Sequence, residues 1–114
     1  MILGIHHITL NVTDVKAAKD FYTRFFCLIE IAKPTSMSGA WLEAEDGRQI
    51  HLRKGEVPED NGQHLAFLVE DIHEVCKALS DAGVAVTVPN GLGSALQSFL
   101  HDPSGNRLEI HQLG

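Results

Sequence analysis

Apolar and polar residues alternate at the start of the chain, and the pattern then changes to a helical one. Within Ile5–Val12 the apolar residues Ile8, Leu10 and Val12 alternate with polar ones, which is typical of a strand with one buried face. Asp14 is suited to cap a helix, and the apolar residues that follow it recur at helical spacing. The pattern therefore predicts a strand and then an amphipathic helix from Val15 to about Phe26.

Three short strands are expected after this helix, and the whole series then repeats. The three strands are predicted at residues 28–32, 40–44 and 49–53, with Asp46-Gly47 as a hairpin turn between the last two. Residues 55–62, GEVPEDNG, are predicted to be a linker. Beyond it we expect a strand at 63–69 and a helix that is capped by Asp71 and ends near Gly83. Three further strands are expected at 84–88, 95–100 and 107–111. A loop at 89–93 would join the first two of these strands, and a tight turn at 102–105 would join the last two.

Two segments of the chain can be aligned directly, which indicates an internal duplication. HITLNVTDV, from His7, aligns with HLAFLVEDI, from His64, at an offset of 57 residues. GRQIHL, from Gly47, aligns with GNRLEI, from Gly105, at an offset of 58. The repeat predicts an α+β fold in which two βαβββ modules, at about 1–54 and 63–114, form one domain over residues 1–114. Its curved, eight-stranded mixed sheet would carry the helices on the outer face.

The repeat also pairs four residues of types that commonly bind metals. His7 aligns with His64, and His51 aligns with Glu109. In each strand the apolar neighbours point the other way, so these four side chains are predicted to share the concave face opposite the helices. They form a candidate site for a divalent metal ion. For His51 the alternative is a pocket residue that hydrogen-bonds the substrate.

Other residues of the same face suggest contacts to a substrate. Arg53 and Arg107 are candidates for binding an anionic group, with solvated strand ends as the alternative. Trp41 is a candidate for an apolar pocket wall, although core packing is equally consistent. His111 shares the face of Glu109 and is a candidate for orienting it.

Composition narrows the range of partners and the compartment. The net charge is −6 and no Lys/Arg cluster occurs, so nucleic acid is not an expected partner. No apolar run approaches the roughly 18 residues needed to cross a bilayer, so no membrane partner is expected. The N-terminal residues do not have the pattern of a signal peptide. Cys27 and Cys76 belong to no CxxC pair, which predicts free thiols and a cytoplasmic location.

These motifs together resemble the vicinal oxygen chelate superfamily, which includes glyoxalase I, methylmalonyl-CoA epimerase, extradiol dioxygenases, fosfomycin-resistance thiol transferases and bleomycin-binding proteins. The resemblance extends over nearly the whole chain, through HHITLNVTD at 6–14, FY at 21–22, AWL at 40–42, IHL at 50–52, HLAFLVED at 64–71 and DPSGNRLEI at 102–110. It implies that His7, His64 and Glu109 are metal ligands. His51 stands where glyoxalase I has a glutamate and the epimerase a glutamine. Cys27 replaces the glycine that many members have after the first helix.

The resemblance implies a metal-dependent lyase or isomerase that acts on a small substrate with vicinal oxygens. One divalent ion (Zn, Ni, Co, Mn or Fe) would be held by His7, His51, His64 and Glu109, with Glu109 also assigned a catalytic role. A fourth ligand favours proton transfer over oxygen activation, because it leaves fewer open positions on the ion. The alternatives are an extradiol-type dioxygenase, a thiol transferase for antibiotic resistance and a metal-free drug-binding protein. A homodimer is expected.

Overall fold

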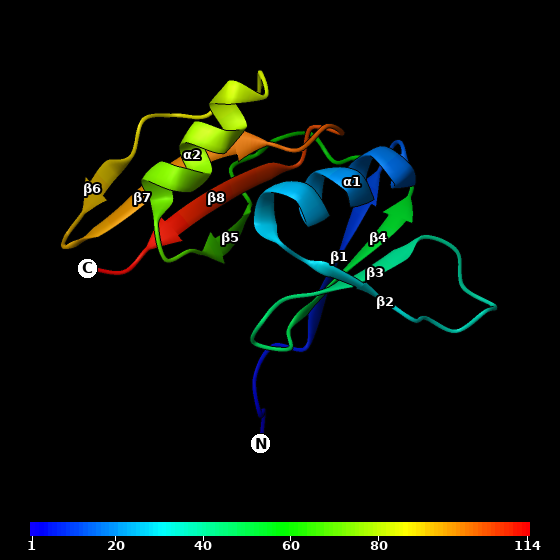
Figure 1. Cartoon of the computed structure of the whole chain (residues 1–114). Helices are drawn as coiled ribbons and strands as arrows, with labels where there is room; N and C mark the ends of the chain where they lie inside the picture. The colour runs from blue at the N-terminus through cyan, green and yellow to red at the C-terminus, as the bar shows by residue number, and fades with distance from the viewer. The chain divides into compact units, whose positions relative to one another are not determined.

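A computed structural model describes all 114 residues of the chain, which form two compact units, residues 1–58 and 59–114 (Figure 1). Each unit holds one helix and one four-stranded sheet. Neither helix is long and apolar enough to span a bilayer. The units are described separately below.

The first unit is a mixed sheet with one helix on one of its faces. Its elements are β1 (His7–Val12), α1 (Val15–Phe26), β2 (Ile29–Ile31), β3 (Ala40–Glu43) and β4 (Gln49–Lys54). The strand order is β1-β4-β3-β2, with β1 parallel to β4 and the other pairs antiparallel. The parallel pair requires a crossover connection, which α1 and the β2–β3 hairpin supply.

The second unit repeats this arrangement. Its elements are β5 (Leu65–Leu68), α2 (Ile72–Asp81), β6 (Asn90–Leu92), β7 (Ala95–His101) and β8 (Arg107–Gln112). The strand order is β5-β8-β7-β6, with β5 parallel to β8. The α+β class and the two βαβββ modules are thus confirmed, and their eight strands form two mixed sheets of four.

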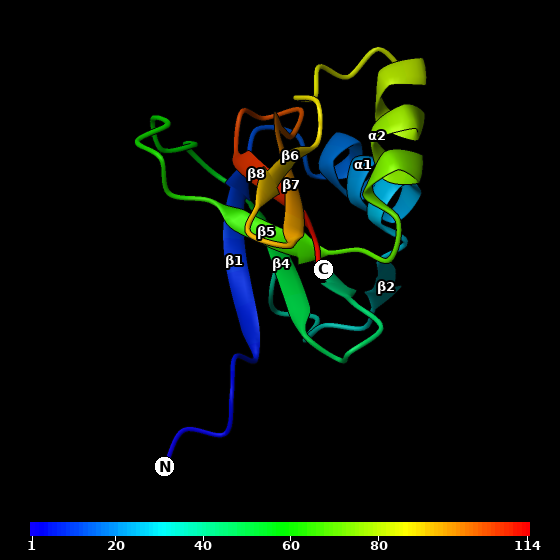
Figure 2. The same cartoon turned by 90° about the vertical axis from the view of Figure 1, so that its left-hand side faces the viewer.

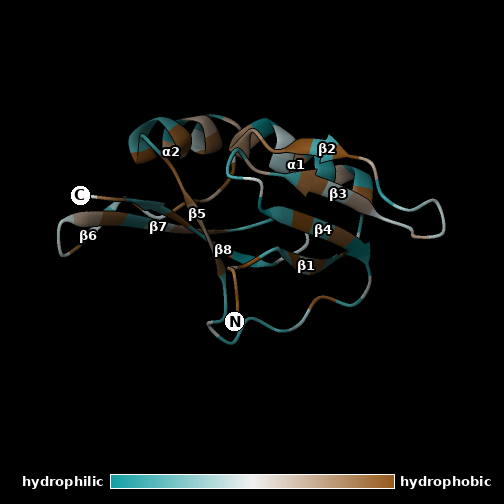
Figure 3. Ribbon diagram, turned by 90° about the horizontal axis from the view of Figure 1, so that it is seen from below, coloured by the Kyte–Doolittle hydropathy of each residue, from teal (hydrophilic) through white to brown (hydrophobic).

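Each helix buries its apolar stripe against one face of its own sheet, as the two helices of Figure 3 illustrate. The fully buried large side chains of the first unit are Val12, Tyr22, Leu42 and Leu52, and those of the second are Ile72, Leu79, Leu108 and Ile110. In β4 and β8 the buried apolar residues alternate with the candidate ligands, as the period of a strand requires. The candidate ligands therefore lie on the face of each sheet that no helix of the same unit covers.

The predicted helix caps are present. Asp14 accepts a hydrogen bond from Ala17 N at 3.1 Å, and Asp71 accepts from the backbone N–H groups of His73 and Glu74. These bonds satisfy backbone donors that have no partner inside the first helical turn. The predicted starts of both helices are thus confirmed.

The edge of the second sheet differs from the prediction. The expected strand at 84–88 is reduced to one isolated bridge between Val86 and Leu100, and the expected loop contains β6 instead. Pro89 has no N–H to donate to a ladder, so it separates this bridge from the strand that follows it. Pairing resumes at β6, which forms a hairpin with β7 across Gly93, at φ 60° (Figure 2).

Candidate functional site

On the open face of the first sheet, three aromatic rings form a continuous stack. The His51 ring lies parallel to that of Trp41, with ring centroids 3.9 Å apart, and to that of His7, with centroids 4.1 Å apart. Neighbouring strands supply the three rings, since Trp41 is directly opposite His51 in the β3–β4 pair and β1 runs along the other side of β4. The structure thus brings the two predicted ligands of this unit into contact.

The stack controls the protonation of His51. Only 8% of His51 is exposed, and this burial, together with the nearby His7 and His6, lowers its pKa below the ordinary value of 6.5. Its Nε2 lies 2.8 Å from Gln49 Oε1, which can only accept, so Nε2 carries the proton of the neutral ring. The lone pair is therefore on Nδ1, the atom that remains for a metal or a substrate.

His7 has a second histidine beside it. His6 Nδ1 lies 2.9 Å from His7 Nδ1, so one of these atoms donates to the other. The His6 side chain is exposed. With Nδ1 engaged in this contact, Nε2 is the atom of His7 that is available to a ligand.

On the open face of the second sheet, a buried carboxylate joins two histidines. Glu109 is 7% exposed, with its Oε1 2.9 Å from His64 Nε2 and its Oε2 2.8 Å from His111 Nδ1. Burying a carboxylate is costly unless it is paired, and these two contacts offset that cost. The predicted ligand pair of this unit therefore lies together, and His111 touches Glu109 as a residue that orients it would.

The hydrogen-bond pattern at His64 calls for either a proton or a metal ion next to Glu109. His64 Nδ1 lies 2.9 Å from the carbonyl oxygen of Gly62, which only accepts, so Nδ1 carries a proton. If the ring is neutral, Nε2 then presents a lone pair to a carboxylate oxygen 2.9 Å away, and two acceptors face each other. A proton or a metal ion must compensate them. Two donor atoms about 2.1 Å from one ion, at a right angle, lie about 3 Å apart, so this pair fits a shared divalent ion.

Within neither unit do three or more His, Cys, Asp and Glu side chains form a group that could hold a metal ion. Each unit instead supplies one pair, His7 with His51 and His64 with Glu109. The four-ligand set stays a prediction.

The duplication extends to aromatic residues that sequence reasoning did not pair. Trp41 lies opposite His51 in the β3–β4 ladder, and Phe99 lies opposite Glu109 in the β7–β8 ladder. The Phe99 ring meets the His64 ring edge-on, with centroids 5.4 Å apart. Each candidate ligand pair thus has an aromatic side chain beside it. The common offset of 58 residues could have identified Phe99.

The two predicted arginines differ in their surroundings. Arg53 is exposed, and its Nε donates to Asn11 Oδ1 at 3.1 Å. Arg107 lies over the Phe99 ring, 4.9 Å from its centroid, and its Nη1 is 3.4 Å from Asp60. Arg107 therefore already has an anionic partner, in a linker residue that the sequence had not marked as functional.

One more carboxylate was missed by sequence reasoning. Glu43 shares the face of Trp41 by strand alternation, is half-buried, and lies opposite Gln49, the partner of His51. The same alternation that placed Trp41 on this face could have placed Glu43 there.

Comparison with known proteins agrees with this arrangement. The family model for the glyoxalase/bleomycin resistance protein/dioxygenase superfamily matches residues 4–110. The metallothiol transferase FosB of Bacillus licheniformis is 29% identical over 96% of this chain and 75% of its own length.

Solved structures give the same result. A protein of Bacillus anthracis described as a glyoxalase family member is 26% identical, covers 100% of this chain and 98% of its own, and has a TM-score of 0.86. The fosfomycin resistance protein FosX of Listeria monocytogenes is 25% identical, covers 97% and 91%, and has a TM-score of 0.84. Given these matches and two βαβββ modules that each present a pair of metal-ligand side chains, the chain belongs to the glyoxalase/bleomycin resistance protein/dioxygenase superfamily.

Proposed function

We propose that this protein is an enzyme that uses one divalent metal ion to act on a small substrate with two adjacent oxygen atoms. The observation that carries the proposal is the His64–Glu109 pair, whose facing nitrogen and oxygen atoms lie 2.9 Å apart and need a proton or a metal ion between them. His7 and His51 would supply the other ligands, through the nitrogens left free by His6 and Gln49. The depressed pKa of His51 supports this role, since only a neutral imidazole binds a metal.

A bound divalent ion would polarise a substrate oxygen and stabilise negative charge that develops on it. Two imidazoles and a carboxylate suit Zn²⁺, Ni²⁺, Co²⁺, Mn²⁺ and Fe²⁺. The aromatic rings of Trp41 and Phe99 would form apolar walls next to the ligands, and Arg53 would attract an anionic group of the substrate. Arg107, already paired with Asp60, is better suited to positioning than to substrate binding.

The reaction class that we favour is proton transfer, as in lyases and isomerases of the glyoxalase and epimerase kind. Such a reaction needs a base, and Glu43 is a half-buried carboxylate on the same sheet face as His51. We assign Glu43 this role in place of a second function for Glu109, whose two oxygens are both engaged by histidines. The variant Glu43→Gln should retain bound metal and lose turnover. An equal loss of both would remove Glu43 from this role.

Thiol transfer is the second candidate, and the similarity to a metallothiol transferase favours it. In such a reaction a thiolate would attack an epoxide carbon, and the carbon–oxygen bond would break to give an alkoxide that then takes up a proton. A bound metal ion would stabilise that alkoxide, and no proton would be abstracted from carbon.

A single screen separates the two candidates. Metal-loaded protein is assayed with the methylglyoxal–glutathione hemithioacetal and, separately, with fosfomycin and cysteine. Isomerisation of the hemithioacetal supports the first class, and consumption of fosfomycin that requires thiol supports the second. If neither substrate reacts and no metal is bound, a metal-free binding protein is the correct reading.

The proposal extends to the setting of the protein. Cys27 and Cys76 are both free thiols, which favours a reducing compartment such as the cytoplasm. We also propose a homodimer, because each unit has unpaired sheet edges that could pair with another chain.

A further inference from the structure

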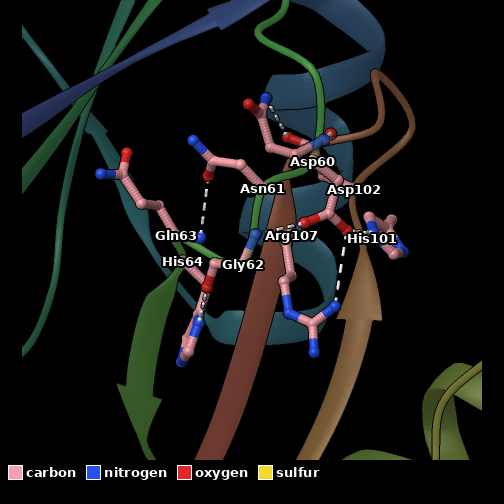
Figure 4. Close-up of polar contacts among 9 residues, drawn as sticks. Asp60, Asn61, Gly62, Gln63, His64, His101, Asp102 and Arg107 are labelled. Carbon is pink, nitrogen blue, oxygen red and sulfur yellow. Dashed lines mark hydrogen bonds and ion pairs between the residues drawn. The ribbon is translucent and has the colours of Figure 1, made fainter.

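The first residues of the second unit are anchored to the β7–β8 hairpin through one carboxylate. Asp60 Oδ2 lies 2.8 Å from His101 Nε2 and 3.4 Å from Arg107 Nη1. His101 ends β7 and Arg107 begins β8, so Asp60 contacts both strands where their connecting turn starts and ends. Figure 4 shows this carboxylate pointing toward the two cationic side chains.

The same side chain fixes the backbone that leads to the metal-ligand candidate His64. Asp60 Oδ1 accepts a hydrogen bond from Gly62 N at 3.0 Å, and Gly62, at φ 96°, turns the chain. The carbonyl of Gly62 then accepts from His64 Nδ1 at 2.9 Å (Figure 4). In this orientation His64 Nε2 lies 2.9 Å from Glu109 Oε1. One residue thus connects the hairpin, the turn and the orientation of the imidazole.

The hairpin end of this chain of contacts is held by hydrogen bonds and ring contacts of its own. Asp102, 4% exposed, accepts from the backbone N–H groups of Ser104 and Asn106 and holds the turn between His101 and Arg107. Arg107 is also held against Phe99, whose ring touches that of His64. Asp60 is therefore bound to a fixed support on the same sheet as Glu109.

We infer that Asp60 is a positioning residue, which sets the tautomer and direction of His64 by holding the Gly62 carbonyl against the Nδ1 proton of His64. The inference rests on the proposed metal function of His64. The outer partners of metal-binding histidines typically change metal affinity by about 10- to 100-fold when removed. Asp60 acts one step further out, so we expect its removal to weaken binding by about tenfold.

The test compares three variants of the full chain. Asp60→Ala removes all three contacts. Asp60→Asn keeps an oxygen for Gly62 N but removes the charge that holds His101 and Arg107. The control, Asp81→Ala, removes an exposed carboxylate of the same unit that forms an ion pair with Lys77.

Two measurements are made on each protein. Long-range ¹⁵N–¹H spectra of the metal-free protein report the protonation of the His64 ring nitrogens, and Co²⁺ titration followed by visible absorption reports affinity. We expect Asp60→Ala to lose the fixed Nδ1–H pattern and to bind Co²⁺ about tenfold more weakly, Asp60→Asn to be intermediate, and Asp81→Ala to match the wild type.

An unchanged His64 spectrum in Asp60→Ala would overturn the inference, whatever happens to affinity, since the effect would then not pass through His64. A changed spectrum with unchanged Co²⁺ affinity would overturn it as well. The His64 spectrum is read without metal, so a wild-type protein that binds no Co²⁺ would contradict the proposed function separately.

Discussion

Two side chains with the same place in the repeat, His51 and Glu109, are buried polar residues on open sheet faces. Each is kept there by its neighbours: His51 by the stacked rings of Trp41 and His7, Glu109 by His64 and His111. Burial keeps His51 neutral, and pairing keeps Glu109 in place. Both conditions prepare the side chains to bind a cation.

The protonation of His51 can be tested directly in the metal-free protein. Because burial is the largest cause of its lowered pKa, NMR titration should give His51 a midpoint below 6.5, and Trp41→Ala should raise it toward 6.5. In the unfolded chain His51 has its ordinary pKa and binds a proton more readily than in the folded protein. His51 therefore makes the free energy of unfolding fall as the pH decreases below about 6.5. A midpoint at or above 6.5 in the wild type would contradict this account of the stack.

Cys27 is the only residue other than glycine with a positive φ, at 53°, and it ends α1. A left-handed conformation costs a residue with a Cβ about 1–2 kcal/mol, and glycine avoids this cost. Glycine also increases the conformational entropy of the unfolded chain, which offsets part of the gain in stability. Cys27→Gly should therefore raise the free energy of unfolding by about 1 kcal/mol in urea titrations with reductant present. Cys27→Ala is the control, because it keeps the Cβ and should give no such gain.

At the scale of elements, the turn between β7 and β8 depends on one buried carboxylate. Asp102 accepts from Ser104 N, Asn106 N and Asn106 Nδ2. Asp102→Ala removes these three hydrogen bonds and should lower the free energy of unfolding by about 3 kcal/mol. The matching turn of the first unit provides the control: Asp46 is exposed and accepts from Arg48 N, so Asp46→Ala should cost less than about 1 kcal/mol. Equal losses would show that burial of Asp102 is not what matters.

The elements that the sequence predicts well are those with a strong local pattern. α1 has the bounds expected from Asp14 and its apolar spacing, and the Asp46-Gly47 turn is present. The edge strand β6 was mistaken for a loop because Asn90-Gly91 resembles a turn, whereas pairing with β7 overrides that local preference. Asp60 was read as part of a linker, because its contacts to His101 and Arg107 join residues more than 40 positions apart.

The sequence could predict the candidate ligands but not the contacts that support them. The repeat marked His7, His51, His64 and Glu109 as candidates because the alignment pairs them. Gln49, Phe99 and Asp60 act through contacts to these residues, and a contact between side chains depends on rotamers and register that no pattern in one sequence encodes.

At the scale of the whole molecule, each unit has two unpaired sheet edges, which are open to pairing with another chain. We expect a homodimer, whose mass light scattering would detect at micromolar concentration. A monomeric mass would contradict this expectation.

Complementation tests whether two chains share each site. If one site takes His7 and His51 from one chain and His64 and Glu109 from the other, a heterodimer of His7→Ala and Glu109→Ala chains contains one intact site out of two. Mixing two inactive variants should then restore metal binding to about half of the sites in that heterodimer. No restoration in a proven dimer would mean that each site lies within one chain.

The central claim is that His64 and Glu109 share a divalent ion with ligands of the other module. The most direct measurement is the metal content and affinity of untagged protein, by elemental analysis and titration with Zn²⁺, Ni²⁺, Co²⁺ and Mn²⁺. The wild type should bind about one ion per chain. The His64→Ala variant should lose most of its metal binding while its circular dichroism spectrum is unchanged. The control, His73→Ala, changes an exposed helical histidine and should bind metal as the wild type does. Absence of metal binding in the wild type, or full binding in His64→Ala, would contradict the account.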